Sequence, residues 1–187
     1  MEITKTLYVT HRDDWRKWLE EHHKTERDIW LIYYRKNADK PRLPYNDAVE
    51  EALCFGWIDS TIKPIDDQAF AQRFSPRRPR SELSPMNRER VKRLILAKKM
   101  TEAGMESIRH AFTEADLHEK TVMPDDLILE LKKDKEVWKN FQQFPESYKR
   151  IRIGWVDGAR QRPEVFKTRL NYFIKMTKKN KMYGMVQ

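Results

Sequence analysis

The segment from residue 51 to residue 100 gathers side chains that can bind an anion. Arg77 and Arg78 are adjacent, and two guanidinium groups offer paired donors for carboxylate or phosphate oxygens. Ser84 and Pro85 suit a helix N-cap and first helical position, and a helix N-terminus presents unpaired backbone N–H groups to an anion. Aromatic rings in the segment could stack on a planar ligand. We therefore predict a ligand-binding cluster made of Trp57, Asp59, Phe74, Arg77, Arg78, Ser84 and Asn87.

The same residues also suit a purely structural role. Asp59 could pair with an arginine and fix a hairpin to the following helix, while Trp57 lies in the core and Asn87 satisfies the loop. Residue types alone do not separate an anion site from such a brace, so both interpretations stay open at this point.

A run of basic residues supports an alternative function, nucleic-acid binding. Ten Lys and Arg residues lie between positions 73 and 99, against two acidic residues, and Phe74 is nearby. However, Arg88, Lys92 and Lys99 fall on the solvent side of an amphipathic helix, where charge is usual. No helix-turn-helix, zinc-finger or RNA-recognition signature accompanies the run. The chain carries a net charge of +9, and its basic excess lies mainly in positions 121–187, where the pattern favours a lysine-rich helical surface over contact with a polyanion.

A third hypothesis is an enzyme whose reaction is unidentified. Cys54 is the one cysteine, and it is predicted near the end of a helix, where the helix dipole opposes a thiolate. We interpret it as a small buried hydrophobic residue. The five His residues lack metal-ligand spacing, and the sequence has no glycine-rich phosphate loop. We therefore predict no metal and no cofactor, and we assign no catalytic residue.

The hydrophobic pattern places the cluster on a small sheet packed against helices. Strands are predicted at 6–10, 28–34, 57–63 and 69–75, the last two forming a hairpin. Helices are predicted at 13–23, 46–55, 84–99 and 101–112. In the hairpin, period-two alternation puts two sets of side chains on single faces: Trp57, Asp59 and Thr61 on one strand, and Phe70, Gln72 and Phe74 on the other. The pattern indicates the α+β class, with a mainly antiparallel sheet of about four strands.

From residue 124 onward the pattern is helical throughout. We predict an α+β domain at 1–120 and an all-helical C-terminal module at 121–187. The mean hydropathy is −0.89, and no apolar run reaches the roughly 18–20 residues of a transmembrane helix. The single cysteine and the absence of a signal-peptide pattern predict a cytoplasmic protein. The oligomeric state stays open.

Several strings resemble one known family, the YdeI/OmpD-associated family, which carries the label "bacteriocin protection". The strings are EALCFGWIDS at 51–60, RFSPRRPRSELSPMNRERV at 73–91, KKMTEAGMESI at 98–108 and the helical stretch that begins PDDLILEL at 124. The resemblance implies a cytoplasmic bacterial protein tied loosely to envelope stress or toxin protection. It supplies no established reaction, cofactor or catalytic residue. The family usually has tryptophan where this chain has Leu83, so a pocket lined by that ring in relatives would be altered here.

Overall fold

The computed structural model describes residues 2–118 and 122–184, and the contacts within it divide the chain into two units. The first unit comprises residues 1–82 and 90–113, and the second comprises residues 83–89 and 114–187. The division therefore falls within helix α3 (Pro85–Leu96). The domain boundary predicted between residues 120 and 121 lies outside the described residues and stays a prediction.

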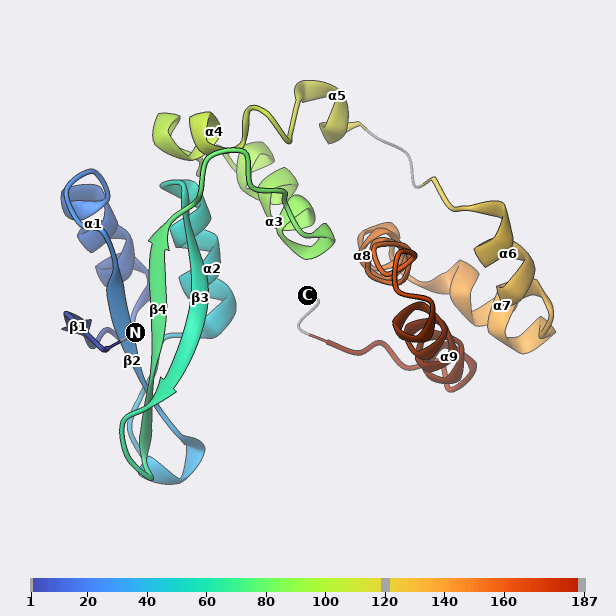
Figure 1. The fold of residues 1–187 in the computed structure, drawn as a ribbon, viewed down its shortest axis with the longest axis horizontal. Coiled ribbons are helices and arrows are strands. Elements are labelled where there is room, and N and C mark those ends of the chain that lie inside the picture. The colour runs from blue at the N-terminus through green and yellow to red at the C-terminus, as the bar shows by residue number, and fades with distance from the viewer. Residues whose placement is uncertain (1, 119–121, 185–187) are drawn as a thin grey trace. The chain divides into compact units, whose positions relative to one another are not determined.

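The first unit is built on a mixed sheet whose strand order is β1-β2-β4-β3 (Figure 1). Its strands are β1 (Thr6–Leu7), β2 (Ile29–Tyr34), β3 (Trp57–Pro64) and β4 (Ala69–Pro76). The β1–β2 pair is parallel, and the β2–β4 and β3–β4 pairs are antiparallel. The prediction of an α+β fold with a mainly antiparallel sheet of about four strands is confirmed over the described residues.

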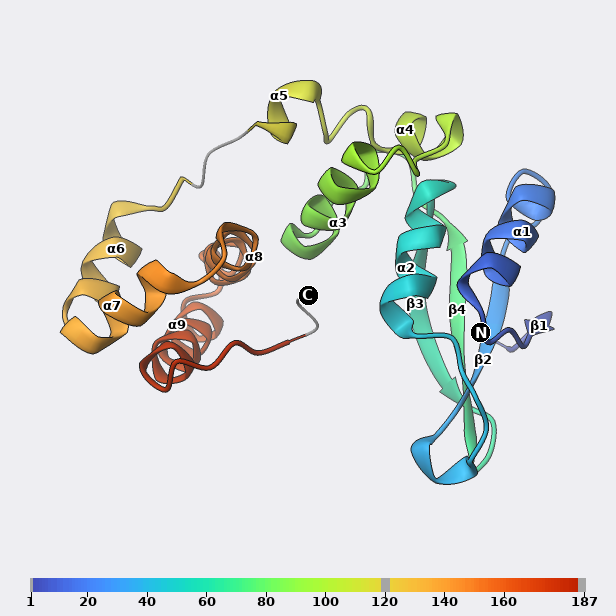
Figure 2. The same ribbon diagram turned by 180° about the vertical axis from the view of Figure 1, so that it is seen from behind.

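Two helices, α1 (Arg12–His22) and α2 (Tyr45–Cys54), cover one face of this sheet (Figures 1 and 2). A short 3-10 helix, Lys36–Ala38, lies between β2 and α2. Alternate residues of β2 point toward the helices because successive strand side chains face opposite sides. The core beneath the helices includes Trp15 and Leu19 of α1 and Ile29, Leu31 and Tyr33 of β2.

The β3–β4 hairpin follows the predicted alternation on one strand and departs from it on the other. Phe70, Gln72 and Phe74 of β4 lie opposite Tyr33, Leu31 and Ile29 of β2, so they share the face that the sequence predicted. In β3 the register shifts between Asp59 and Ile62. A bulge places one extra residue in a strand and resets its alternation. The predicted grouping of Thr61 with Trp57 and Asp59 is therefore wrong, and Thr61 is exposed.

Helix α4 (Glu102–Ile108) is held against the end of α2 by two glycines. A Cβ atom on Gly104 would lie 2.2 Å from the carbonyl oxygen of Cys54, closer than any Cβ contact allows. Gly56 has φ +74°, and a Cβ there would lie 2.9 Å from Cβ of Ser107. Thr101 caps the helix by accepting from the N–H of Gly104 at 3.3 Å. The predicted helix start at 101–102 is confirmed, and these glycines fix where α4 lies.

The second unit is helical where it is described. Beyond the first turn of α3 it contains α5 (Glu114–Leu117), α6 (Asp125–Lys132), α7 (Lys135–Gln143), α8 (Glu146–Asp157) and α9 (Pro163–Lys178). Asp134 caps α7 by accepting from the N–H groups of Glu136 and Val137. The aromatic stripe forms a separate core around Phe141, Tyr148 and Phe173. The all-helical nature predicted for this part of the chain is confirmed. In the described part of both units, no helix has the length and apolar character needed to cross a membrane.

Candidate functional site

A basic cavity lies in the first unit between the loop that follows β4 and helix α4. Its volume is about 470 Å³. It is lined by Arg77, Arg78, Pro79, Arg80, Glu106, Ser107, Arg109 and His110. Four arginines and one glutamate give this lining a formal charge of +3 when His110 is neutral. The cavity is therefore an electropositive hollow of the size that binds small molecules, about 300–1,000 Å³.

The loop is shaped by a tight turn at its start. The backbone N–H of Arg77 donates to the carbonyl of Gly56 at 2.9 Å, which ties the loop to the beginning of β3. The N–H of Ser81 donates to the carbonyl of Arg78 at 3.1 Å and closes the turn. Within that turn Arg80 adopts φ +58°, a left-handed conformation that is uncommon for residues other than glycine. This short loop carries three arginines, Arg77, Arg78 and Arg80.

The side chain of Arg77 is held by hydrogen bonds within the loop. Its Nη2 donates to the carbonyl of Ser81 at 3.0 Å, to the hydroxyl of Ser81 at 3.1 Å and to the carbonyl of Glu82 at 3.1 Å. All three acceptors are neutral, and Arg77 forms no ion pair with any described carboxylate. Its Nε is buried without a hydrogen-bond partner. Burial lowers the pKa of Arg77, but an arginine remains charged at neutral pH.

The other cations around the cavity differ in how free they are. The side chains of Arg78 and Arg80 are exposed, and neither pairs with a carboxylate in the described part of the chain. Arg109 is paired with Glu106 on the same helix at 2.6 Å. Nε2 of His110 lies 3.1 Å from the carbonyl of Ser81 and so ties the loop to the end of α4. The cavity thus holds three cations whose charge no described acid neutralises.

Two predicted ligand residues, Trp57 and Phe74, lie in the hydrophobic core instead. Trp57 is 1% exposed and Phe74 is 0% exposed. Nε1 of Trp57 donates to the carbonyl of His23 at 3.1 Å, and its ring packs edge-on against Trp18. Neither ring is exposed to a ligand. Trp57 therefore lies in the core, as the structural interpretation expected, and Phe74 lies there too. A side chain on the core face of a half-covered sheet is buried by the helices above it.

Asp59 is also engaged in holding the fold. Its Oδ2 accepts from the hydroxyl of Tyr45 at 2.6 Å, which joins β3 to α2. Burial, together with this hydrogen bond, raises the pKa of Tyr45. The brace that we considered for Asp59 differs in both partner and helix, because Asp59 bonds to a tyrosine of the preceding helix α2 and not to an arginine at the following helix.

The helix-start residues of the predicted cluster belong to the second unit. The hydroxyl of Ser84 accepts from the backbone N–H of Asn87 at 3.2 Å, which is the expected N-cap contact. Arg77 and Arg78 lie in the first unit, while Ser84 and Asn87 lie in the second. Of the residues in the predicted cluster, Arg77 and Arg78 line the cavity and the others do not.

Sequence reasoning missed the contribution of α4 to this cavity. Ser107, Arg109 and His110 line it together with Arg80. Their sequence neighbourhood reads as an ordinary amphipathic helix end, about thirty positions after the arginine pair. The available signal was the glycine at position 104, since a glycine inside a helix often marks a close backbone approach.

Comparison with family models identifies both parts of the chain. Residues 7–107 match the model described as "Domain of unknown function (DUF8412)", which is more than half of the chain. The chain belongs to this family. Residues 120–180 match the model described as "Bacteriocin-protection, YdeI or OmpD-Associated", so the predicted resemblance is confirmed there. The strings at 51–60 and 73–91, and all but the last residue of the string at 98–108, lie within the first match and outside the second. No curated protein and no solved structure matched the chain.

The basic run at 73–99 is largely committed to intramolecular contacts. Arg73 pairs with Asp28 at 2.7 Å, and Arg93 pairs with Glu50 at 2.5 Å. Arg90 is 6% exposed and donates to Asn46, and Lys92 is also 6% exposed. These side chains do not form a continuous solvent-facing stripe. The prediction that Lys92 lies on the solvent side of its helix is wrong, because its side chain is buried.

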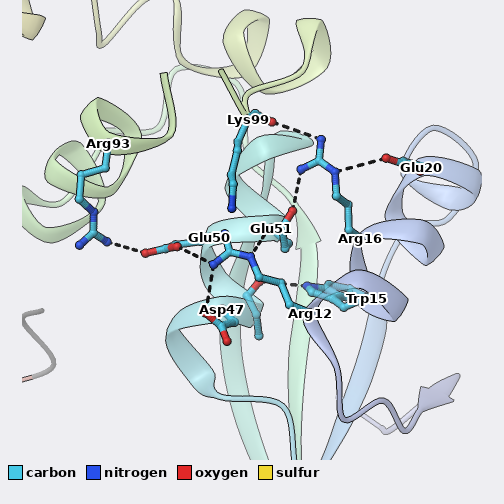
Figure 3. Close-up of polar contacts among 10 residues, drawn as sticks. Arg12, Trp15, Arg16, Glu20, Asp47, Glu50, Glu51, Arg93 and Lys99 are labelled. Atoms are coloured by element: carbon cyan, nitrogen blue, oxygen red, sulfur yellow. Dashed lines mark hydrogen bonds and ion pairs between the residues drawn. The ribbon is translucent and has the colours of Figure 1, made fainter. Parts of the chain in front are cut away.

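A buried acid–arginine network is centred on Glu51, near Cys54, and accounts for several other charges of the first unit. Figure 3 shows its acids and arginines. Glu51 of α2 is 1% exposed and accepts from Arg12 and Arg16 of α1. Cys54 itself is 0% exposed, and burial together with the nearby charge of Glu51 raises its pKa to about 11. The thiol is therefore protonated at neutral pH, as expected of a buried hydrophobic cysteine. In the described part of the chain, no group of three His, Cys, Asp or Glu residues is placed to hold a metal ion.

Proposed function

We propose that this chain binds a small oxyanion, either phosphate or the phosphate group of a small metabolite, in the cavity between the β4–α3 loop and α4. This location differs from the one predicted from the sequence, which combined the hairpin with the Ser84 helix start. The observation that carries the proposal is the half-buried guanidinium of Arg77, which has only neutral acceptors and a buried Nε without a partner.

The chemistry of the lining favours phosphate. Arginine presents a planar fork of donors that matches phosphate oxygens, and charge-assisted hydrogen bonds are the stronger kind. Arg77 is held in place by the loop, so little side-chain entropy is lost when a ligand binds. Arg78 and Arg80 add two exposed cations to the lining. The net positive charge of the lining raises the local concentration of anions.

Glu106 sets a limit on what the cavity accepts. Its carboxylate lies in the lining and holds Arg109 at 2.6 Å. An anionic ligand would face this carboxylate, which weakens binding and leaves Arg109 only partly available. The proposal therefore expects moderate affinity for phosphate, and higher affinity when the charge of Glu106 is removed.

The test is calorimetric titration of inorganic phosphate at constant ionic strength, followed by mononucleotides. The informative variant is Arg78→Ala/Arg80→Ala, because both side chains are exposed and their loss should leave the fold intact. The matched control is Arg162→Ala/Lys167→Ala, which removes the same charge from exposed positions of the second unit. We expect the first pair to weaken phosphate binding about tenfold or more, since each charge-assisted hydrogen bond is worth roughly 1.5–3 kcal/mol.

Two results would oppose the proposal. The first is wild-type protein that shows no saturable binding of phosphate or nucleotides at millimolar concentration. The second is equal phosphate affinity in the two double variants, which would show that any loss of binding follows from the change in net charge and not from the cavity. Retention of a labelled oligonucleotide with a steep salt dependence, unchanged in Arg78→Ala/Arg80→Ala, would instead favour the nucleic-acid alternative.

We also propose a biological role and a cellular location for the chain. The description of the second family model suggests a role in protection against bacteriocins, and we infer a cytoplasmic location from the single, buried, free Cys54. Deleting the gene and measuring survival under bacteriocin challenge tests the role. Complementation with Arg78→Ala/Arg80→Ala would show whether the cavity takes part in it.

A further inference from the structure

The second unit contains an arginine that is buried far more deeply than those of the cavity. Arg152 lies in the middle of α8 and is 5% exposed. Arginine is almost never this deeply buried unless its charge is paired, because removing a cation from water is unfavourable. The partners of Arg152 therefore decide what this position does.

Aromatic rings surround the guanidinium of Arg152. Its Cζ lies 4.5 Å from the ring centroid of Tyr183, 5.5 Å from that of Tyr148 and 5.8 Å from that of Trp155. Tyr183 also packs edge-on against the other two rings. Cation–π contacts at these distances attract the cation and offset part of its desolvation. They do not neutralise its charge.

No counter-ion for Arg152 is found among the described residues. It forms no ion pair with any described carboxylate, and its Nε is buried without a hydrogen-bond partner. The nearby Tyr183 hydroxyl does not serve as an anion, because burial raises its pKa to about 12 even though Arg152 opposes the rise. Burial raises the pKa of Tyr148 as well. Both phenols are neutral at physiological pH.

A second cation contacts the same indole. The Cζ of Arg169 lies 4.8 Å from the ring centroid of Trp155, and its Nη1 donates to the backbone carbonyl of Trp155 at 2.6 Å. Arg169 is half-buried and also lacks an ion pair with any described carboxylate. Two guanidinium groups therefore contact one indole, and neither pairs with a described acid, so a bound anion would offset their charge.

The segment after α9 passes directly over this group. The N–H of Tyr183 donates to the hydroxyl of Tyr148 at 3.4 Å. Gly184 has φ +81°, and a Cβ atom there would lie 2.7 Å from Nη2 of Arg152. The backbone of Gly184 therefore packs against one end of the guanidinium, where a side chain would clash with Nη2.

We propose that Arg152 and Arg169 form a second oxyanion site, located in the helical module, which takes a carboxylate or phosphate group beside Trp155 and Gly184. This site is independent of the cavity around Arg77, because every residue that builds it belongs to the second unit. The aromatic rings orient the Arg152 fork, and the oxyanion supplies the charge that the described side chains do not.

The experiment uses the full chain and follows the arginine Nε–H resonances by nitrogen-15 NMR during titration with sodium phosphate or sodium acetate, against sodium chloride at equal ionic strength. We expect the Arg152 resonance to shift saturably with at least one of the two oxyanions. Arg169→Gln should weaken that response about tenfold, the loss expected when one charge-assisted contact is removed.

Controls separate this site from net charge and from the cavity. Arg162→Gln removes one exposed cation of the same module and should leave the Arg152 titration unchanged. Arg78→Ala/Arg80→Ala should also leave it unchanged, even if it abolishes binding at the cavity. The proposal is overturned if neither oxyanion shifts the Arg152 resonance beyond chloride, or if Arg169→Gln titrates like wild type. Since Arg169→Gln keeps the buried Arg152 in place, the test does not depend on a variant that might not fold.

Discussion

The substitution Glu51→Gln should remove a large share of the stability of the first unit. Glu51 is 1% exposed and joins α2 to α1 through Arg12 and through Nη1 of Arg16 at 2.7 Å (Figure 3). Glutamine preserves the volume but removes the charge, so two charge-assisted hydrogen bonds are weakened. At roughly 1.5–3 kcal/mol for each bond, the upper limit of the loss is about 3–6 kcal/mol.

Neighbouring acids reduce that loss. Arg12 keeps contacts with Asp47 and Glu50, each at 3.1 Å, and Arg16 keeps Glu20 at 3.3 Å. The two arginine side chains are also 24% and 28% exposed, so water compensates in part. We therefore expect Glu51→Gln to lower the free energy of unfolding by about 2–4 kcal/mol, near the lower end of the range for broken buried ion pairs.

The measurement is urea unfolding followed by tryptophan fluorescence and by circular dichroism, because the two units need not unfold together. The matched control is Glu20→Gln, which removes the same charge from a side chain that is 54% exposed on the same network. Exposed pairs are worth about 0.2–1 kcal/mol, so this control should lie close to wild type. If Glu51→Gln and Glu20→Gln lose the same small amount, the network does not hold α1 to α2 in the way that the distances indicate.

Four further outcomes follow from the structure. Cys54, whose pKa burial raises to about 11, should resist thiol reagents at pH 8 and react only in urea-unfolded protein; rapid labelling of folded protein would contradict its burial. Burial acts to raise the pKa of Asp28, but hydrogen bonds from Arg73 and Thr4, together with the charge of Arg73, outweigh it and the pKa is lowered. The extra stability of wild type over Asp28→Asn should therefore be full above about pH 4 and disappear as the pH falls through the folded-state pKa, as measured by unfolding at each pH. Gly104→Ala should lower the free energy of unfolding by about 3 kcal/mol or more and weaken phosphate binding, because its Cβ would lie 2.2 Å from a backbone oxygen and α4 must move; calorimetry and urea unfolding that both match wild type would oppose this. Glu106→Gln should tighten phosphate binding several-fold by removing like charge from the cavity, roughly 1 kcal/mol, and an unchanged or weaker affinity by calorimetry would place the anion elsewhere.

The sequence predicted the local elements well, because their signals are local. The serine–proline pair at 84–85 begins α3 as expected, and the apolar run at 29–34 is a central strand. The bulge between Asp59 and Ile62 was not predictable from alternation, since no residue type marks it. A bulge depends on how two strands pair, and pairing is a property of both strands together.

The ligand-binding cluster was predicted less well than the helices and strands, because residue types do not show which side chains become buried. Trp57 and Phe74 have the residue types of a stacking platform, yet a ring becomes core whenever helices cover its face of the sheet. That cover comes from α1 and α2, which lie before the hairpin in the chain. The cavity, in turn, needs α4, which is brought to the arginine loop by two close approaches of glycine backbone. Neither relation can be obtained from the residues of the motif alone.

In a chain with 38 Lys and Arg residues, the number of cations does not identify a binding site. The positions of the 29 acids are more informative, because an acid that pairs with an arginine neutralises the charge that an anionic ligand would need. In the first unit, Asp28 pairs with Arg73 and Glu50 pairs with Arg93, whereas Arg77 is a half-buried cation whose described acceptors are all neutral. The same criterion selects Arg152 in the second unit, where π faces rather than carboxylates surround the guanidinium. An arginine that is kept from water and is not paired with an acid retains its electrostatic field, and that field is what an oxyanion would find at both places.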